Sequence, residues 1–117
     1  MAVYRCEVKR ISRSSGRSSV AAAAYRAADR LLNTRDERCH DYRRRHAGVM
    51  HSEILAPADA PEWARDRGTL WNAAEAAERR KDGTTAREVI ISLPHELDDA
   101  QRIQAVRQFS QALVERY

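Results

Sequence analysis

The chain has 117 residues and a formal net charge of +4, a length that suits one domain with a single modest core. Hydrophobic residues make up 43% of it and charged residues 32%, and no apolar run approaches the roughly 18 residues that span a bilayer. Charged side chains also occupy the first residues, where a signal peptide would need an apolar stretch. We therefore expect a soluble, cytoplasmic protein without membrane insertion.

Arginine supplies most of the positive charge, since lysine occurs only at Lys9 and Lys81. Guanidinium groups bind phosphate oxygens and stack on bases, so nucleic acid is the first partner to test. A basic surface that is only solvated is the alternative, because composition alone does not separate the two. Cys6 and Cys39 are far apart in the sequence, and we interpret both as reduced thiols rather than as a disulfide or a metal site.

The first part of the chain predicts a half-buried strand over residues 2–10, because apolar and polar side chains alternate there. Its apolar face carries Tyr4, Cys6 and Val8, and its polar face carries Arg5, Glu7 and Lys9. A Ser/Gly loop over residues 11–19 leads into an alanine-rich helix that extends to about Leu32. We expect the charged residues 33–47 to be exposed and poorly ordered without DNA, and residues 49–55 to form a short strand.

The second half predicts helices around one further strand. A helix start is expected near Glu62, and a helix over residues 70–80 is expected to be capped by Thr69. Residues 86–93 alternate and predict the best-defined strand, while Asp98 with Gln101 predicts the start of a last helix. The inner face of that helix is expected to carry Ile103, Val106, Phe109, Leu113 and Tyr117. This order favours an α+β fold, with helices packed on one face of an antiparallel sheet that is incomplete in this chain.

Tyr25 lies near the middle of the alanine-rich helix, shortly after the Ser/Gly loop. The loop residues Arg13 and Arg17, with the free amides of the helix start, predict an anion-binding corner because both groups suit phosphate oxygens. A phenol beside a phosphate site is a candidate nucleophile for phosphodiester transfer. A buried core tyrosine is the plainer interpretation of the same residue. We expect single-stranded DNA to bind through Arg13, Arg17 and the polar strand residues Arg5 and Lys9.

Several segments, in colinear order over almost the whole chain, match one known family. They are Ala2-Val3-Tyr4, Gly16-Arg17-Ser18-Ser19 with Tyr25, Asp41-Tyr42, residues 51–57, Pro61-Glu62-Trp63, Leu70-Trp71-Asn72 with Glu75 and Glu78, Ala86-Arg87-Glu88 and Leu93-Pro94-His95-Glu96-Leu97. Together they closely resemble the N-terminal part of MobA/MobL relaxases, including the relaxase domain of Ti-type TraA proteins. Colinear agreement over this length is far more specific than any single motif.

The resemblance implies an HUH endonuclease fold and a relaxase that nicks one strand at a plasmid origin of transfer. It places Tyr25 at the family's nucleophile position, where attack on a phosphodiester gives a 5′-phosphotyrosyl intermediate. It places Glu88 beside the family's histidine cluster, where a carboxylate orients a metal-binding histidine. It also implies a divalent metal, Mg²⁺ or Mn²⁺, in the full-length enzyme, and relaxosome and type IV secretion coupling proteins as partners. Residues 1–117 are then the N-terminal part of a bacterial relaxase domain.

The family's metal site needs a later cluster that ends in His-hydrophobic-His, and the histidines of this chain have neither that spacing nor that position. They are His40, His46, His51 and His95. We therefore assign no metal ligands, expect no metal on this chain, and expect it not to nick DNA unaided. Two other functions stay open: a non-catalytic basic module that binds single-stranded DNA with steep salt dependence, and a structural or interaction domain with a solvated arginine surface.

Overall fold

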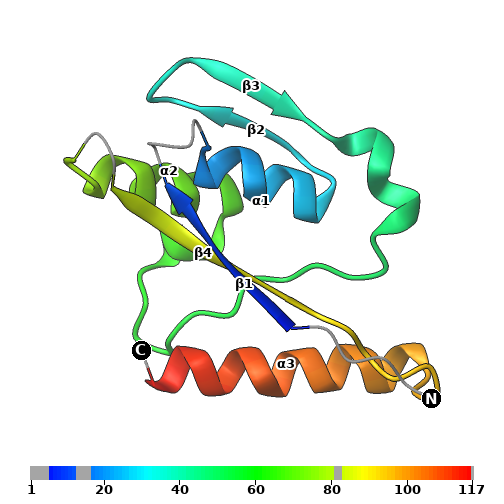
Figure 1. Cartoon of the computed structure of the whole chain (residues 1–117). Helices are drawn as coiled ribbons and strands as arrows, with labels where there is room; N and C mark the ends of the chain where they lie inside the picture. The colour runs from blue at the N-terminus through cyan, green and yellow to red at the C-terminus, as the bar shows by residue number, and fades with distance from the viewer. Residues whose placement is uncertain (1–5, 13–16, 81–82, 117) are drawn as a thin grey trace.

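The computed structural model describes residues 6–12, 17–80 and 83–116. In chain order the elements of these residues are β1 (Cys6–Ser12), α1 (Ser19–Ala27), β2 (Arg30–Asn33), β3 (Arg38–Asp41), the 3₁₀ helices η2 (Arg43–Gly48) and η3 (Glu62–Arg65), α2 (Arg67–Ala77), β4 (Thr84–Ile91) and α3 (Asp99–Arg116). The predicted α+β class with antiparallel strands is confirmed. Within the described residues the strands form two separate two-stranded sheets, β1–β4 and β2–β3, rather than one (Figure 1).

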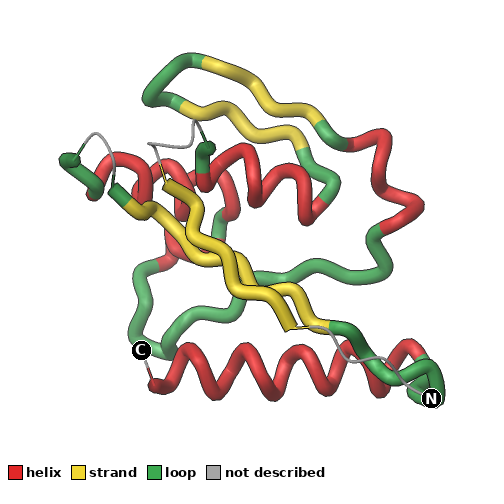
Figure 2. The backbone as a smooth tube through the Cα atoms, viewed as in Figure 1, coloured by secondary structure: helices red, strands yellow, loops and turns green. Residues whose placement is uncertain are grey.

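The β1–β4 pair crosses the middle of the molecule as a long ribbon, with helices towards both of its ends (Figure 2). α1 and α2 pack against each other near the end where β1 finishes, and the β2–β3 hairpin covers α1. α3 runs past the other end of the ribbon. The Cα radius of gyration is 15.1 Å, against about 13 Å for a compact domain of this length. The described elements therefore enclose only a thin core.

In the β1–β4 ribbon, Val8 lies opposite Val89 and Lys9 lies opposite Glu88. Directly opposed residues share a face of the pair, and the face of Lys9 and Glu88 is turned towards α1, whose Arg26 reaches Glu88. The two predicted strands are confirmed over residues 6–10 and 86–91, and residues 2–5 of the first lie outside the described residues. The predicted burial of the apolar face of β1 is wrong, since Val8 is 64% exposed. Among the described residues, no element packs on that face closely enough to bury it.

α1 begins after Ser18, whose hydroxyl accepts hydrogen bonds from the amides of Val20 and Ala21. Such a cap contributes about 1 kcal/mol, because it satisfies amides that have no partner inside the helix. The predicted extension of this helix to Leu32 is wrong. Ala28 adopts a left-handed conformation (φ 53°), and its amide closes the helix on two carbonyls of the last turn. The chain then turns back and enters β2.

The charged segment after α1 folds as a hairpin, in which β2 pairs with β3 and Glu37 takes a left-handed turn conformation (φ 58°). The inner side of β2 buries Leu31 and Asn33, and Asn33 Nδ2 donates to the Ser18 hydroxyl at 3.1 Å. The expected exposure of the outer side chains is confirmed. The segment is a hairpin and not an irregular loop, and these inner contacts join it to α1. Poor order of residues 33–47 without DNA stays a prediction. The strand expected over residues 49–55 is also wrong, since those residues join no helix or strand.

The apolar core lies between α1 and the hairpin. Val20, Ala24 and Leu31 are buried together, and Tyr42 and Trp71 pack against them. Alanine side chains let the helix backbone approach its neighbours closely, so this core depends on close packing more than on large side chains.

The largest fully buried side chain among the described residues is charged. Glu75 of α2 is 1% exposed, and its Oε1 accepts hydrogen bonds from the Ser19 amide (2.8 Å) and the Ser19 hydroxyl (2.9 Å). Arg35, in the turn between β2 and β3, places its Nε 3.4 Å from the other carboxylate oxygen. A carboxylate at a helix N-terminus is favourable, because the free amides and the helix dipole both point towards it. Glu75 therefore joins α1, α2 and the hairpin.

The helix start predicted near Glu62 is confirmed as the single 3₁₀ turn η3. α2 begins earlier than expected, because its cap is Asp66 and not Thr69. The Asp66 carboxylate accepts hydrogen bonds from the Thr69 amide (2.9 Å) and the Thr69 hydroxyl (2.6 Å). Gly68, which lies between them, belongs to the first turn of α2 and packs near Leu31.

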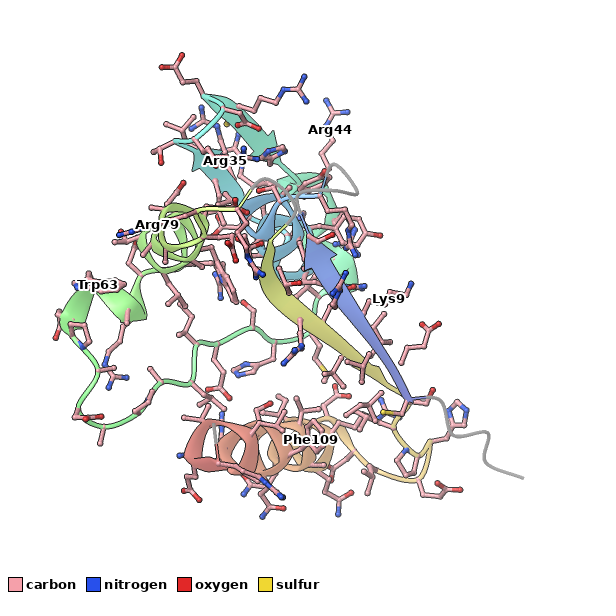
Figure 3. All side chains as sticks on the ribbon, turned by 60° about the vertical axis from the view of Figure 1, so that its left-hand side comes forward. Lys9, Arg35, Arg44, Trp63, Arg79 and Phe109 are labelled. Atoms are coloured by element: carbon pink, nitrogen blue, oxygen red, sulfur yellow. The ribbon has the colours of Figure 1, made fainter. Side chains whose placement is uncertain are left out.

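The predicted start of α3 is confirmed, because the Asp98 amide donates to Gln101 Oε1 (2.9 Å) and the Gln101 amide donates to Asp98 Oδ1 (2.8 Å). The predicted burial of its apolar face is wrong: Phe109, labelled in Figure 3, and its apolar neighbours on α3 stay partly exposed. Tyr117, assigned to the same face, lies outside the described residues. Within the part of the chain that the structure describes, no helix combines the length and the apolar character needed to cross a membrane.

Replacing Glu75 with alanine is expected to lower the free energy of unfolding by about 3 kcal/mol, because the Ser19 amide and hydroxyl lose their buried acceptor. The control is Glu62→Ala, which removes an exposed carboxylate from η3 and should change stability by less than about 0.5 kcal/mol. Urea unfolding followed by circular dichroism measures both variants. A loss in Glu75→Ala no larger than that of the control would contradict the role given to this carboxylate.

Candidate active site

Tyr25 lies near the C-terminal end of α1 and is 41% exposed. α1 turns Val20 and Ala24 into the core and leaves the Tyr25 ring outside the buried cluster. The plainer interpretation of this residue as a core tyrosine is therefore wrong. Its side chain is accessible to a ligand.

Three side chains surround the Tyr25 ring. Tyr42 meets it edge to face, with the two ring centroids 5.3 Å apart and an interplanar angle of 83°. The Cζ of Arg45 lies 3.7 Å from the ring centroid, and the Cζ of Arg26 lies 5.4 Å from it. Cations over an aromatic face are attracted by the negative charge of that face. Two positive charges therefore lie beside an accessible phenol.

Glu88 of β4 connects to this region through Arg26. Arg26 Nε donates to Glu88 Oε2 at 2.9 Å, and Arg17 Nη2 lies 3.8 Å from Glu88 Oε1. The Arg26 hydrogen bond, helped by the charges of Arg26, Arg17 and Lys9 and opposed by partial burial, lowers the pKa of Glu88 below its ordinary value. The same hydrogen bond raises the pKa of Arg26. Ionised Glu88 thus holds Arg26 beside the Tyr25 ring.

The structure brings part of the predicted DNA-binding set together. Arg17, just before α1, lies beside Glu88. Lys9 lies directly across the β1–β4 pair from Glu88, on the part of β1 labelled in Figure 3. Arg5 and Arg13 lie outside the described residues. The two predicted cations that are described therefore gather around one carboxylate, next to the helix that carries the tyrosine.

The sequence does not predict Arg26, Tyr42 or Arg45 as members of this site. Arg26 directly follows Tyr25, and its role depends on the approach of β4 to α1. Tyr42 and Arg45 reach Tyr25 because the hairpin returns the chain to the end of α1, where the Tyr42 amide donates to the Asp29 carbonyl at 3.0 Å. The sequence does not predict the hairpin, and for that reason it does not predict this contact either. No local pattern of residues indicates it.

The histidines are dispersed. His40 lies on β3 and His46 in η2, whereas His51 and His95 lie outside helices and strands. Among the described residues, no group of three or more His, Cys, Asp or Glu side chains could hold a metal ion. These residues therefore do not fit the divalent metal that the resemblance implies.

The lowered pKa of Glu88 predicts a pH-dependent contribution to stability. Because the pKa in the folded chain lies below the ordinary value of 4.5, this contribution is fully present above that value and is lost as the pH falls through the folded pKa. Urea unfolding of the wild type and Glu88→Gln from about pH 7 to about pH 3 measures it. The difference in free energy of unfolding should shrink on acidification, and a constant difference would contradict the Arg26–Glu88 contact.

Comparison with known proteins shows the family of the chain. A model of the MobA/MobL family matches residues 17–117, a range that contains Tyr25, Glu88 and the arginines around them. The chain is 43% identical over 117 residues to the mobilization protein MobL of Acidithiobacillus ferridurans, covering 100% of this chain and 30% of that protein. It is 41% identical over 119 residues to the conjugal transfer protein TraA of Rhizobium radiobacter, covering 93% of this chain and 11% of that protein.

A solved structure described as the molecular basis of vancomycin resistance transfer in Staphylococcus aureus shares the fold, with a TM-score of 0.85 and 33% identity. The match covers 95% of this chain and 56% of that chain. The chain spans less than a third of the length of the MobL and TraA relatives. The family model matches residues 17–117, and the MobL relative is 43% identical over 117 residues. The chain therefore belongs to the MobA/MobL family.

Proposed function

We propose that this chain supplies the nucleophile-bearing part of a relaxase, which nicks one DNA strand at an origin of transfer during plasmid conjugation or mobilisation. Membership of the MobA/MobL family supports this proposal, as do relatives named for mobilization and conjugal transfer. The observation that carries it is the exposed side chain of Tyr25 beside the guanidinium groups of Arg26 and Arg45. A tyrosine that serves packing alone needs no such surroundings.

In the proposed reaction the phenolic oxygen of Tyr25 attacks the phosphorus of a backbone phosphodiester. A bond forms between the tyrosyl oxygen and the 5′ phosphate, and the bond from phosphorus to the 3′ oxygen breaks. The phenol gives up its proton to solvent, and the departing 3′ oxygen takes up a proton to become a hydroxyl. The phosphotyrosyl diester conserves the energy of the broken bond, so the reverse attack by the hydroxyl rejoins the strand.

Arg26 and Arg45 supply positive charge where a phosphate approaches the phenol and where negative charge develops during attack. Glu88 holds Arg26 through a hydrogen bond of 2.9 Å. We propose that Glu88 acts in the reaction by positioning this cation. The further role that the resemblance implies, orienting a metal-binding histidine, requires a histidine from outside the described residues.

We propose that the metal-binding histidines, which the described residues do not supply, belong to another part of the complete protein. The Mg²⁺ or Mn²⁺ site belongs to that part, and the chain alone is expected not to nick DNA. The reaction takes place in the bacterial cytoplasm, together with relaxosome proteins and a type IV secretion coupling protein. The modest share of the MobL relative that this chain covers, 30%, is consistent with this division.

Binding of single-stranded DNA is expected to involve Arg5, Lys9, Arg13 and Arg17. Affinity should fall with salt by roughly 0.7 log units per phosphate contact, because bound strands release counterions. Fluorescence anisotropy should show weaker binding and a shallower salt slope in a variant with Arg13→Ala and Arg17→Ala.

A double variant at two arginines outside the proposed DNA-binding set serves as the control for this measurement. Arg79→Ala with Arg116→Ala removes the same net charge from the segment after α2, where Figure 3 labels Arg79, and from the end of α3. Equal losses of affinity in the two double variants would indicate a general charge effect and contradict the proposed strand path. A binding affinity independent of salt would leave an interaction domain with a solvated arginine surface as the function.

In the complete protein, Tyr25→Phe is expected to abolish covalent attachment to DNA while leaving DNA affinity and folding nearly intact. Phenylalanine keeps the ring and its contacts with Tyr42 and Arg45 but removes the attacking oxygen. The loss of one hydrogen bond would change stability by only about 1 kcal/mol. The measurement is transfer of a labelled origin oligonucleotide to protein, seen as a shifted band on a denaturing gel with Mg²⁺ or Mn²⁺ present.

Tyr42→Phe removes the other phenol near the site and locates the attacking oxygen. An adduct in Tyr42→Phe and none in Tyr25→Phe is the expected result. An adduct that persists in Tyr25→Phe would end the assignment of the nucleophile. DNA binding without any adduct in the wild type would favour the non-catalytic DNA-binding module.

A further inference from the structure

We propose that Tyr42 and Arg45 form a clamp, defined by these two residues, that fixes the orientation of the Tyr25 ring for attack. The inference rests on the proposed function of Tyr25 as nucleophile and deepens it by naming positioning residues. Its basis is that an exposed side chain on the last turn of a helix has several rotamers open to it. Two anchored neighbours, a perpendicular aromatic ring and a guanidinium over its face, restrict that choice.

Tyr42 is the fixed part of the clamp. Its backbone amide donates to the Asp29 carbonyl at 3.0 Å, which ties it to the turn that follows α1. Its ring packs against the buried cluster of Val20, Ala24 and Leu31. Tyr42 therefore presents a fixed ring, nearly perpendicular to the Tyr25 ring, with the two centroids 5.3 Å apart.

Arg45 is the second part and contacts Tyr25 twice. Its Nη1 donates to the Tyr25 carbonyl, and its guanidinium lies over the ring face at 3.7 Å from the centroid. The Arg45 amide donates to the Tyr42 carbonyl at 3.0 Å, so the first turn of η2 fixes one residue of the clamp relative to the other. A cation is also favourable at the C-terminal end of α1, where the helix carbonyls point.

The clamp places Tyr42 and Arg45 against the ring, while the Tyr25 side chain stays 41% exposed. Attack on phosphorus requires the phenolic oxygen to lie in line with the departing 3′ oxygen, and a displacement of about 1 Å costs up to about 100-fold in rate. If the ring is already fixed before DNA binds, less conformational entropy is lost when the phenolic oxygen reaches the position for attack. The clamp therefore acts on the rate of attachment more than on DNA affinity.

Arg44 is a matched control, because it lies next to Arg45 in η2 and its side chain extends away from the molecule (Figure 3). In the complete protein at saturating origin oligonucleotide, Arg45→Ala is expected to slow formation of the covalent adduct by roughly 10- to 100-fold. Arg44→Ala removes the same charge and is expected to keep the wild-type rate. Both variants should lose DNA affinity to a similar, small extent. Equal adduct rates in Arg45→Ala and wild type would overturn the clamp.

A second readout needs no activity. In protein labelled with ¹³C-tyrosine, NMR measures the chemical shifts of the Tyr25 ring. In Arg45→Ala these shifts should move towards the values of an unstructured tyrosine, whereas in Arg44→Ala they should keep the wild-type values. Both variants should have the circular dichroism of the wild type. Unmoved Tyr25 resonances in Arg45→Ala would overturn the clamp even if the rate fell. The proposed function fails separately, if the wild type forms no adduct while these resonances still respond to Arg45→Ala.

Discussion

The hydrogen bonds between Glu75 and Ser19 are the contact on which the position of the tyrosine-bearing helix α1 depends. A buried carboxylate on α2 accepts from the first amide of α1 at 2.8 Å, and the dipole of α1 favours that charge. Two adjoining contacts extend this junction: Arg35 approaches the other carboxylate oxygen at 3.4 Å, and Asn33 donates to Ser18 at 3.1 Å. Because α1, α2 and the hairpin meet there, the junction sets where the far end of α1, and so Tyr25, lies.

From that fixed start, α1 carries Tyr25 outwards and ends two residues later. The left-handed Ala28 directs the chain into the hairpin, which returns Tyr42 and Arg45 to the tyrosine. β4 supplies Glu88 from the opposite side, and the carboxylate holds Arg26 at 2.9 Å. A nucleophilic phenol and its cations thus come from elements distant in sequence. The buried junction supplies the rigidity, while the phenol itself stays exposed to a substrate.

The sequence predicts elements whose signals are local. The alternation of apolar and polar side chains predicts β1 and β4. The spacing of Asp98 and Gln101 predicts the start of α3, where the two residues exchange hydrogen bonds. The sequence misplaces the end of α1, because alanine carries no signal for the left-handed conformation that Ala28 adopts. It misses the hairpin because β2 and β3 are short and highly charged, and their pairing is stabilised by tertiary contacts through Leu31 and Asn33. Likewise, Tyr25 and Glu88 stand out through a family resemblance, but Arg45 becomes visible only after folding.

Peptide mapping of the trapped protein–DNA adduct identifies the residue that attacks the phosphodiester. Trypsin cleaves after Arg17 and Arg26, so Tyr25 lies in the peptide 18–26, whereas Tyr42 lies in the peptide 39–43. After nuclease digestion of the bound strand, attack by Tyr25 should leave the mass of a residual 5′-linked nucleotide on peptide 18–26. A nucleotide on peptide 39–43, or on any peptide without Tyr25, would contradict it.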